Sequence, residues 1–210
     1  MKDARYWVIS DTHFGHKGMI HCGLRAPGFE RRIITHWKRD VAPRDIVIHL
    51  GDVGESDLIP SLPGRKWLIR GNHDRLSDQR YLDLGWDWIG ELMILRRWGV
   101  GIELTHIPRR PAEGSTWQIH GHFHKNHPDR WGSADCAALD PRHRLVSLEE
   151  TGYRLLPLEL IRKRDSAITD IAAEPVQRFV KSFARMTRLR TVQRAEWETD
   201  DRDVGVGIPS

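Results

Sequence analysis

The chain has 210 residues, a net charge of +4 and twelve histidines, and its length suits one domain with an appendage. No apolar run approaches the ~20 residues that a membrane helix needs, and the N-terminus lacks the features of a signal peptide. Two cysteines, Cys22 and Cys136, are too few for a disulfide framework or a four-cysteine zinc site, so we expect a cytoplasmic protein with free thiols and no membrane partner.

The first part of the chain alternates between predicted strands and helices. Short apolar runs at residues 5–10, 45–50 and 66–70 are typical of buried strands. A helix is predicted over residues 29–41, where Ile33, Ile34, Trp37 and Val41 recur at helical spacing. Residues 75–84 are expected to form a helical turn or two.

The next part is mainly strand-like. Strands are predicted at residues 86–95, 100–105, 116–120, 134–139, 144–148 and 153–158. Alternating strands and helices followed by a run of strands predict an α/β fold whose layers are built on two sheets.

Residues 161–210 differ in character and are expected to form an extension of a domain at residues 1–160. Pro175 suits the first turn of a helix. After it, apolar and basic side chains fall on opposite helical faces. We expect this basic amphipathic helix to pack on the domain, with binding to nucleic acid or to a membrane surface as alternatives. The polar, glycine-rich end of the chain is expected to be disordered.

Polar clusters follow the predicted strands or lie in the loops between them, where sites form in open α/β sheets. They contain seven potential metal ligands: Asp11, His13, Asp52, Asn72, His106, His122 and His124. Oxygen and imidazole ligands without a thiolate suit Mn²⁺, Fe or Zn²⁺. One octahedral ion would leave no open position with seven ligands, whereas two ions sharing a carboxylate leave room for water and substrate.

The order of these clusters, DTH, GD, GNHD, H and HGHFH, resembles the calcineurin-like metallophosphoesterase superfamily, and in particular its small single-domain bacterial and phage members. The segments ISDTHFGH, RAPGF, RDIVIHLGDV, IRGNHD, IHGHFH and PRHRLVSLEE carry the resemblance, over about residues 4–155. It implies a two-sheet β sandwich flanked by helices, the four-layer αββα fold, with the C-terminal helical extension outside it.

The resemblance also implies a ligand set for two divalent or trivalent ions. One ion would be held by Asp11, His13, Asp52 and His124, and the other by Asp52, Asn72, His106 and His122, so that Asp52 bridges them. Manganese is the ion expected first, with iron, zinc or nickel as alternatives. Both ions would bind the substrate phosphate and activate the attacking water.

Further side chains are candidates for the reaction itself. His73 follows Asn72, is not needed as a ligand, and is expected to protonate the leaving group as a general acid. Glu55, or else Asp74, would orient it. Substrate contacts are expected from His16, Arg25 and Arg109, with a solvated loop histidine and surface arginines as the alternatives. His49 and His120 are expected to be core or supporting residues.

The sequence therefore predicts a metal-dependent phosphoester hydrolase, first of all a phosphodiesterase that acts on nucleotides or nucleic-acid ends. A phosphomonoesterase is the alternative within catalysis. A protein phosphatase fits less well, because GDVGES and GNHD depart from the GDxVDRG and GNHE patterns of those enzymes. A metal-binding scaffold that has lost catalysis is the alternative outside it. The oligomeric state cannot be read from the sequence.

Overall fold

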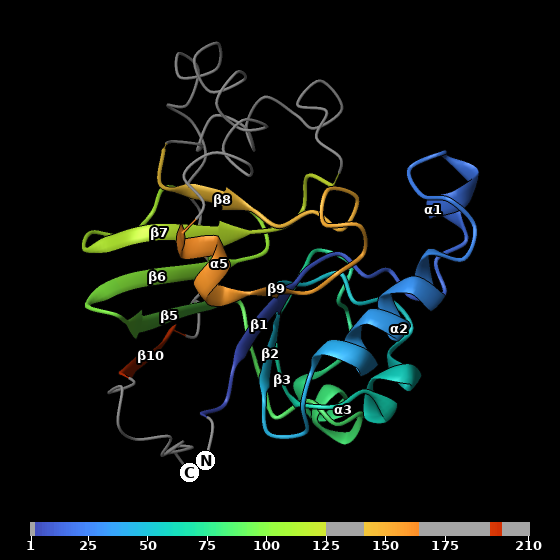
Figure 1. Ribbon diagram of the computed structural model, residues 1–210, viewed down its shortest axis with the longest axis horizontal. Helices are drawn as coiled ribbons and strands as arrows, with labels where there is room; N and C mark the ends of the chain where they lie inside the picture. Colours follow the sequence, from blue (N-terminus) through green and yellow to red (C-terminus); the bar gives the residue numbers. More distant parts are fainter. Residues whose placement is uncertain (1–2, 125–140, 164–193, 199–210) are drawn as a thin grey trace.

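The computed structural model describes residues 3–124, 141–163 and 194–198 (Figure 1). Its first sheet has the strand order β4-β3-β2-β1-β9. Strands β1 (Tyr6–Ile9), β2 (Ile46–His49), β3 (Arg65–Ile69) and β4 (Trp88–Gly90) are parallel, and β9 (Leu156–Pro157) is antiparallel to β1. The connections contain α1 (Gly18–His21), α2 (Phe29–Asp40), the 3-10 helix η1 (Ser56–Ser61) and α3 (Asp78–Asp83).

The second sheet has the order β10-β5-β6-β7-β8. Its strands are β5 (Leu92–Arg97), β6 (Val100–Thr105), β7 (Ser115–His120), β8 (His143–Leu145) and β10 (Arg194–Glu198). Strands β6, β7 and β8 are parallel, and β5 is antiparallel to β6. A short helix, α5 (Leu158–Lys163), follows β9.

The two sheets share one apolar core and a helical layer covers the first sheet. Val8 and Ile48 of the first sheet pack in the same cluster as Leu104 and Ile119 of the second. On the opposite face of the first sheet, alternate residues such as Ile9 pack with three buried side chains of α2, namely Phe29, Ile33 and Trp37. Figure 1 shows α2 and α3 beside strands β1 to β3. The mixed α/β fold with two sheets is thus confirmed.

Two of the predicted strands are wrong in detail. The segment 86–95 is not one strand: β4 ends the first sheet, Glu91 is exposed, and β5 begins the second. The apolar run hides this change of sheet because both pieces are buried. The segment 153–158 contributes only the short β9, and α5 begins at Leu158.

Several predictions fall on parts of the chain that the structure does not describe. The strand at 134–139 and the basic helix after Pro175 lie outside the described residues. Helix α1 has no counterpart among the elements predicted from the sequence. No helix within the described ranges has the length and apolar character that crossing a membrane requires.

Candidate metal centre

The seven predicted ligands come from loops that follow parallel strands. Asp11 and His13 follow β1, Asp52 follows β2, Asn72 follows β3, His106 follows β6, and His122 and His124 follow β7. Six of the seven are buried, and Asn72 is exposed. Side chains separated by more than a hundred residues in the sequence thus meet at one place, at the carboxyl ends of strands from both sheets.

The backbone at five of these positions lies in the left-handed region. The φ angles are 54° at Asp11, 45° at His13, 56° at Asp52, 75° at His122 and 48° at His124. Residues other than glycine rarely adopt such angles. The fold therefore holds these five residues in a costly backbone conformation, which is a pattern typical of functional sites.

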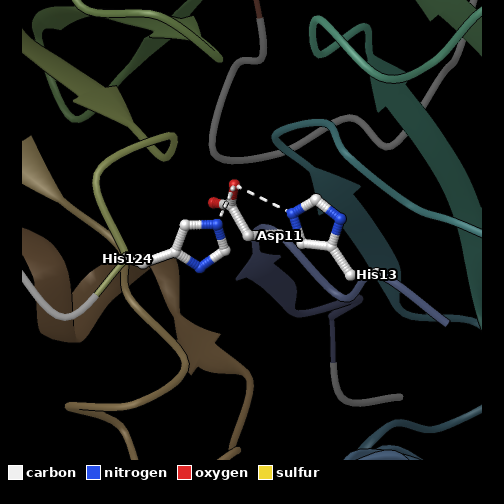
Figure 2. A group of neighbouring side chains, drawn as sticks. All are labelled: Asp11, His13 and His124. Carbon is white, nitrogen blue, oxygen red and sulfur yellow. Dashed lines mark ion pairs between the residues drawn. The ribbon is translucent and has the colours of Figure 1, made fainter. Parts of the chain in front are cut away.

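The first group of ligand atoms surrounds Asp11 (Figure 2). Asp11 Oδ1 lies 4.0 Å from His13 Nε2 and 3.8 Å from His124 Nε2. Ligand atoms bound to one ion at about 2.1 Å lie roughly 3–4 Å apart, so these separations are of the right size. Among the described residues, neither Asp11 Oδ1 nor His13 Nε2 has a hydrogen-bond partner, although both are buried. Buried polar atoms without a partner are costly, and a cation between them would satisfy both.

The His13 imidazole is suited to binding a metal at neutral pH. Burial, together with the neighbouring His124 and Arg25, outweighs the two nearby carboxylates and lowers the pKa of His13 to about 4. The ring is therefore neutral near pH 7 and has a lone pair to offer.

Asp52 lies between the two groups of ligands. Its Oδ2 atom is 3.6 Å from His13 Nε2, 3.4 Å from His106 Nε2 and 4.0 Å from His73 Nε2. The other oxygen, Oδ1, accepts a hydrogen bond of 2.8 Å from the His73 backbone N–H. Asp11 also belongs to both groups, because it clusters with His13 and His124 and again with Asp52 and His106. The two carboxylates thus lie in contact with imidazoles of both groups, where ligands shared between two ions would have to lie.

The second group surrounds His106 Nε2. This atom lies 3.0 Å from Asn72 Oδ1 and 3.3 Å from His122 Nδ1, in addition to its contact with Asp52. His106 Nδ1 lies 2.7 Å from the Leu50 carbonyl oxygen and must donate its proton there. A neutral His106 would therefore direct its Nε2 lone pair at Asp52 Oδ2 and Asn72 Oδ1, and a cation at this point would relieve that repulsion.

In the absence of a metal ion, a proton on His106 provides the positive charge. Burial lowers the pKa of His106, but the hydrogen bond to Asp52 and the charges of Asp11 and Asp52 outweigh it and raise the pKa to about 9. The site thus attracts positive charge at this point, whether a proton or a metal ion provides it.

Two glycines allow the loops to approach closely. A Cβ atom at Gly71 would lie 2.1 Å from Asp52 Oδ1, and one at Gly121 would lie 1.8 Å from Ser10 Oγ and 2.5 Å from Asp11 Oδ2. No larger residue fits at either position without moving the carboxylates. The glycines of the GNHD and HGHFH motifs are therefore part of the site.

Asp74 holds two of the loops together. Its Oδ2 atom accepts hydrogen bonds from the backbone N–H groups of Asp52 (2.7 Å) and Gly71 (2.8 Å), and Oδ1 accepts one from Val53 (3.0 Å). Burial raises the pKa of this carboxyl. Its side chain thus fixes the backbone of the ligand loops. Among the described residues, no hydrogen bond or ion pair joins it to the His73 ring.

His49 lies behind the centre and connects two of the loops. His49 Nε2 is 2.9 Å from Thr12 Oγ1, and Nδ1 accepts from the Gly51 N–H at 3.0 Å. Thr12 in turn donates to the Val53 carbonyl oxygen at 2.8 Å. Burial lowers the pKa of His49, as of His120, to about 3. Both histidines are neutral supporting residues, in agreement with the sequence-based expectation.

His73 and His16 lie at the open rim. The His73 side chain is 54% exposed, and its ring centroid lies 5.6 Å from that of His13 and 6.5 Å from that of His16. Glu55 is exposed and lines the same depression as His73. In the part of the chain that the structure describes, no hydrogen bond links the two side chains, so an orienting role of Glu55 stays a prediction.

Arg25 is placed differently from what the sequence suggested. Its guanidinium is fully buried behind His124, with Nε donating to Glu149 Oε1 at 2.6 Å and Nη1 donating to the Thr12 carbonyl oxygen at 3.0 Å. Glu149 Oε1 also lies 3.4 Å from His124 Nδ1. This enclosed position does not favour contact with a substrate.

Glu149 is the buried residue that sequence reasoning missed. Burial raises its pKa, but the hydrogen bond with His124 and the charge of Arg25 outweigh that effect and lower the pKa to about 2. No spacing in the sequence connects Glu149 with residues 25 and 124. The only available signal was its place in the LVSLEE segment.

Arg109 is held by a buried carboxylate. Its Nε donates to Glu103 Oε1 at 2.8 Å, and its side chain is 37% exposed. Arg109 also lines a cavity of about 480 Å³ beside the centre, together with Arg70, Glu91, Asn72 and His106. A substrate contact by Arg109 is therefore within its reach and stays a prediction.

A second, smaller cavity of about 230 Å³ opens directly over the ligands. It is lined by His13, Asn72, His73 and His124, and by Met19 and Leu24 on its apolar side. Asn72 lines both cavities and His73 lines the smaller one. The centre is thus accessible from solvent and has space beside it as well as above it.

Comparison with known proteins assigns no activity to the chain. No family model matches it. The uncharacterized protein MJ1445 of Methanocaldococcus jannaschii is 29% identical over 179 residues, which cover 78% of this chain and 92% of the relative. The Gene 66 protein of Mycobacterium phage D29 is 32% identical over 82 residues, 34% of this chain and 41% of that protein.

A solved structure shares the fold. The protein of unknown function AQ665 from Aquifex aeolicus aligns with a TM-score of 0.63 and 29% identity, over 77% of this chain and 99% of its own. The described architecture is therefore one that another, shorter protein adopts over almost its whole length.

Proposed function

We propose that the protein is a metal-dependent phosphoesterase of the calcineurin-like metallophosphoesterase type. Asp11, His13, Asp52 and His124 would hold one ion, and Asp52, Asn72, His106 and His122 the other. The observation that carries this proposal is the convergence on Asp52 Oδ2 of imidazole nitrogens from His13 and His106, 3.6 Å and 3.4 Å away. Partners of this kind on both sides of one carboxylate are what a bridging ligand needs.

The donor set supports the choice of ion. All seven candidates offer oxygen or imidazole nitrogen, which suits Mn²⁺ first, with iron, zinc or nickel as alternatives. When bound, two such ions supply charge for the substrate phosphate and lower the pKa of a water molecule. The remaining chemistry has to come from the side chains of the rim.

His73 is the side chain placed to move a proton. It is exposed at the opening, and its Nε2 atom lies 4.0 Å from Asp52 Oδ2, so the ring is beside the ligands without being enclosed by them. A protonated Nε2 can transfer its proton to the oxygen of the leaving group.

The cavities favour a phosphodiester. A substrate phosphate at the ligands would have one space above it, between His73 and the apolar Met19, and another beyond Asn72 that reaches Arg70 and Arg109. A monoester needs only one of these spaces for its single organic group. We therefore propose a phosphodiesterase that acts on nucleotides or nucleic-acid ends, with the phosphomonoesterase as the alternative.

The proposal is tested with metal-replete protein and two chromogenic substrates, bis-p-nitrophenyl phosphate and p-nitrophenyl phosphate, with added Mn²⁺. We expect hydrolysis of both and a higher kcat/KM for the diester. His73→Gln should lower kcat by about 10²-fold or more for a diester with a poor leaving group, and by much less for nitrophenol, which needs no acid. His36→Gln on α2 serves as the control. No hydrolysis of either substrate by protein with two bound ions would contradict the proposal.

A further inference from the structure

Glu149 is a buried carboxylate that is in contact with a predicted metal ligand and is not itself one. Its side chain is 5% exposed, and its Oε1 atom lies 3.4 Å from His124 Nδ1 and 2.6 Å from Arg25 Nε. The Oε2 atom accepts from Ser147 Oγ at 2.8 Å. Both oxygens are thus engaged by groups that hold the carboxylate in one orientation.

The proton on the His124 ring decides whether this residue can bind an ion. His124 Nε2 faces Asp11 Oδ1 at 3.8 Å, so the nitrogen that would bind the ion is Nε2. It can do so only with a free lone pair, and the proton must then be on Nδ1. Glu149 Oε1 is the acceptor that this Nδ1 proton requires.

Arg25 alone would favour the opposite arrangement. Its Nη2 atom lies 3.4 Å from His124 Nδ1, and a guanidinium nitrogen can donate a hydrogen bond but cannot accept one. Facing that donor alone, Nδ1 would accept a hydrogen bond and the ring proton would be on Nε2, where it blocks the ion. Glu149 therefore has to outweigh Arg25, and the 2.6 Å contact between the two directs the arginine to the carboxylate instead.

We propose that Glu149 is a positioning residue that sets the metal-binding tautomer of His124, with Arg25 holding Glu149 in place. The inference rests on the proposed metal centre and goes beyond it, because it assigns a function to two residues that bind neither ion nor substrate. Arg25 also donates to the Thr12 carbonyl oxygen at 3.0 Å, between Asp11 and His13. The pair thus connects the ligand loop after β1 with the ligand loop after β7.

The consequence is specific to one of the two ions. His124 belongs to the group with Asp11 and His13, whereas His106 and His122 contact each other in the second group of ligands. Removing a hydrogen-bond partner of a ligating histidine typically weakens metal binding by about 10–100-fold. We expect Glu149→Gln to lower the affinity for the ion held by His124 by this factor and to leave the affinity for the other ion unchanged.

The experiment titrates Mn²⁺ and Zn²⁺ into metal-free wild type, Glu149→Gln and the control Glu150→Gln by calorimetry. Glu150 is the exposed neighbour, so its variant loses the same charge without touching His124. ¹⁵N spectra of the Zn²⁺-loaded protein report the His124 tautomer directly. The wild type should show the proton on Nδ1, and Glu150→Gln should match it in tautomer and in affinity within about twofold, a small change beside the expected loss.

A second variant distinguishes a loss of metal binding from a loss of folding. Arg25→Met/Glu149→Leu removes both charges together, so that no unpaired charge is buried. This double variant should fold, and it should still bind one of the two ions more weakly than the wild type does. The inference would be overturned if Glu149→Gln bound each of the two ions as tightly as the wild type does, or if it lost the same affinity for both ions. Either result would leave the proposed function intact. A wild type that binds no ion would overturn both.

Discussion

Gly121→Ala tests how closely the two ligand loops approach each other. The added methyl carbon would lie 1.8 Å from Ser10 Oγ and 2.5 Å from Asp11 Oδ2, whereas ordinary contacts begin near 3.4 Å. Ser10 would have to move by about 1.6 Å to accommodate it. Ser10 cannot move easily, because it is fully buried and lies between the hydrogen bonds Leu50 N to Ile9 O and Asp11 N to Gly51 O.

Overpacking of this size should cost about 3 kcal/mol, the upper part of the usual range. The displaced Asp11 would also lose its hydrogen bond from the His122 N–H, which is 3.0 Å long. Metal affinity should therefore fall by at least about tenfold. Urea unfolding of the metal-free protein measures the first effect, and a Mn²⁺ titration measures the second.

Two variants separate the causes. Gly99→Ala in the turn between β5 and β6 meets nothing within 4 Å but has a φ of 74°, so it should cost about 1 kcal/mol through backbone strain and leave metal binding unchanged. Ser10→Ala/Gly121→Ala removes the nearest atom but leaves Asp11 Oδ2 at 2.5 Å and the Cβ atom of residue 10 at 2.8 Å. It should recover part of the stability without recovering affinity, because Asp11 is still displaced. A Gly121→Ala protein as stable as Gly99→Ala, with two ions at wild-type affinity, would refute this reasoning.

Three further predictions concern charge. The folded pKa of Glu149, about 2, lies below its ordinary value of 4.5, so its ionised form stabilises the protein above pH 4.5. This contribution of about 3 kcal/mol should disappear as the pH falls toward 2. Urea unfolding should therefore show a free energy of unfolding that depends less on pH in Glu149→Gln than in the wild type. Since the pKa of His106 is raised to about 9, metal binding at pH 7 should release a proton from this ring, and calorimetry in two buffers should detect a release that shrinks toward pH 9. Asp74→Asn places an amide against backbone N–H groups that now donate to Asp74; it should cost about 1–3 kcal/mol of unfolding free energy, and a variant as stable as wild type would show that these bonds contribute little.

The convergence of the candidate metal ligands was the part of the site that the sequence predicted best. Short polar motifs directly after apolar runs mark the carboxyl ends of strands, and parallel strands bring those ends together. That is why Asp11, Asp52 and Asn72 could be grouped although they are far apart in the chain. Their mutual distances, and the position of Asp11 between both groups, needed the folded structure.

Residues that act through other side chains could not be predicted in this way. Glu149 and Arg25 meet only because the segment after β8 returns to the loop before α2, and an isolated Arg or Glu carries no pattern. The change of sheet at Glu91 was hidden for a related reason: both flanking strands are buried, so the apolar run has no polar break except one residue. Periodicity reports burial, but it does not report which sheet provides it.

The most direct test of the two-ion centre is an anomalous difference map from crystals of the protein loaded with Mn²⁺. The account predicts two peaks about 4 Å apart on either side of Asp52, one near His13 and His124 and one near His106 and His122. A single peak away from Asp52, or no peak in protein that is folded and saturated with Mn²⁺, would contradict it.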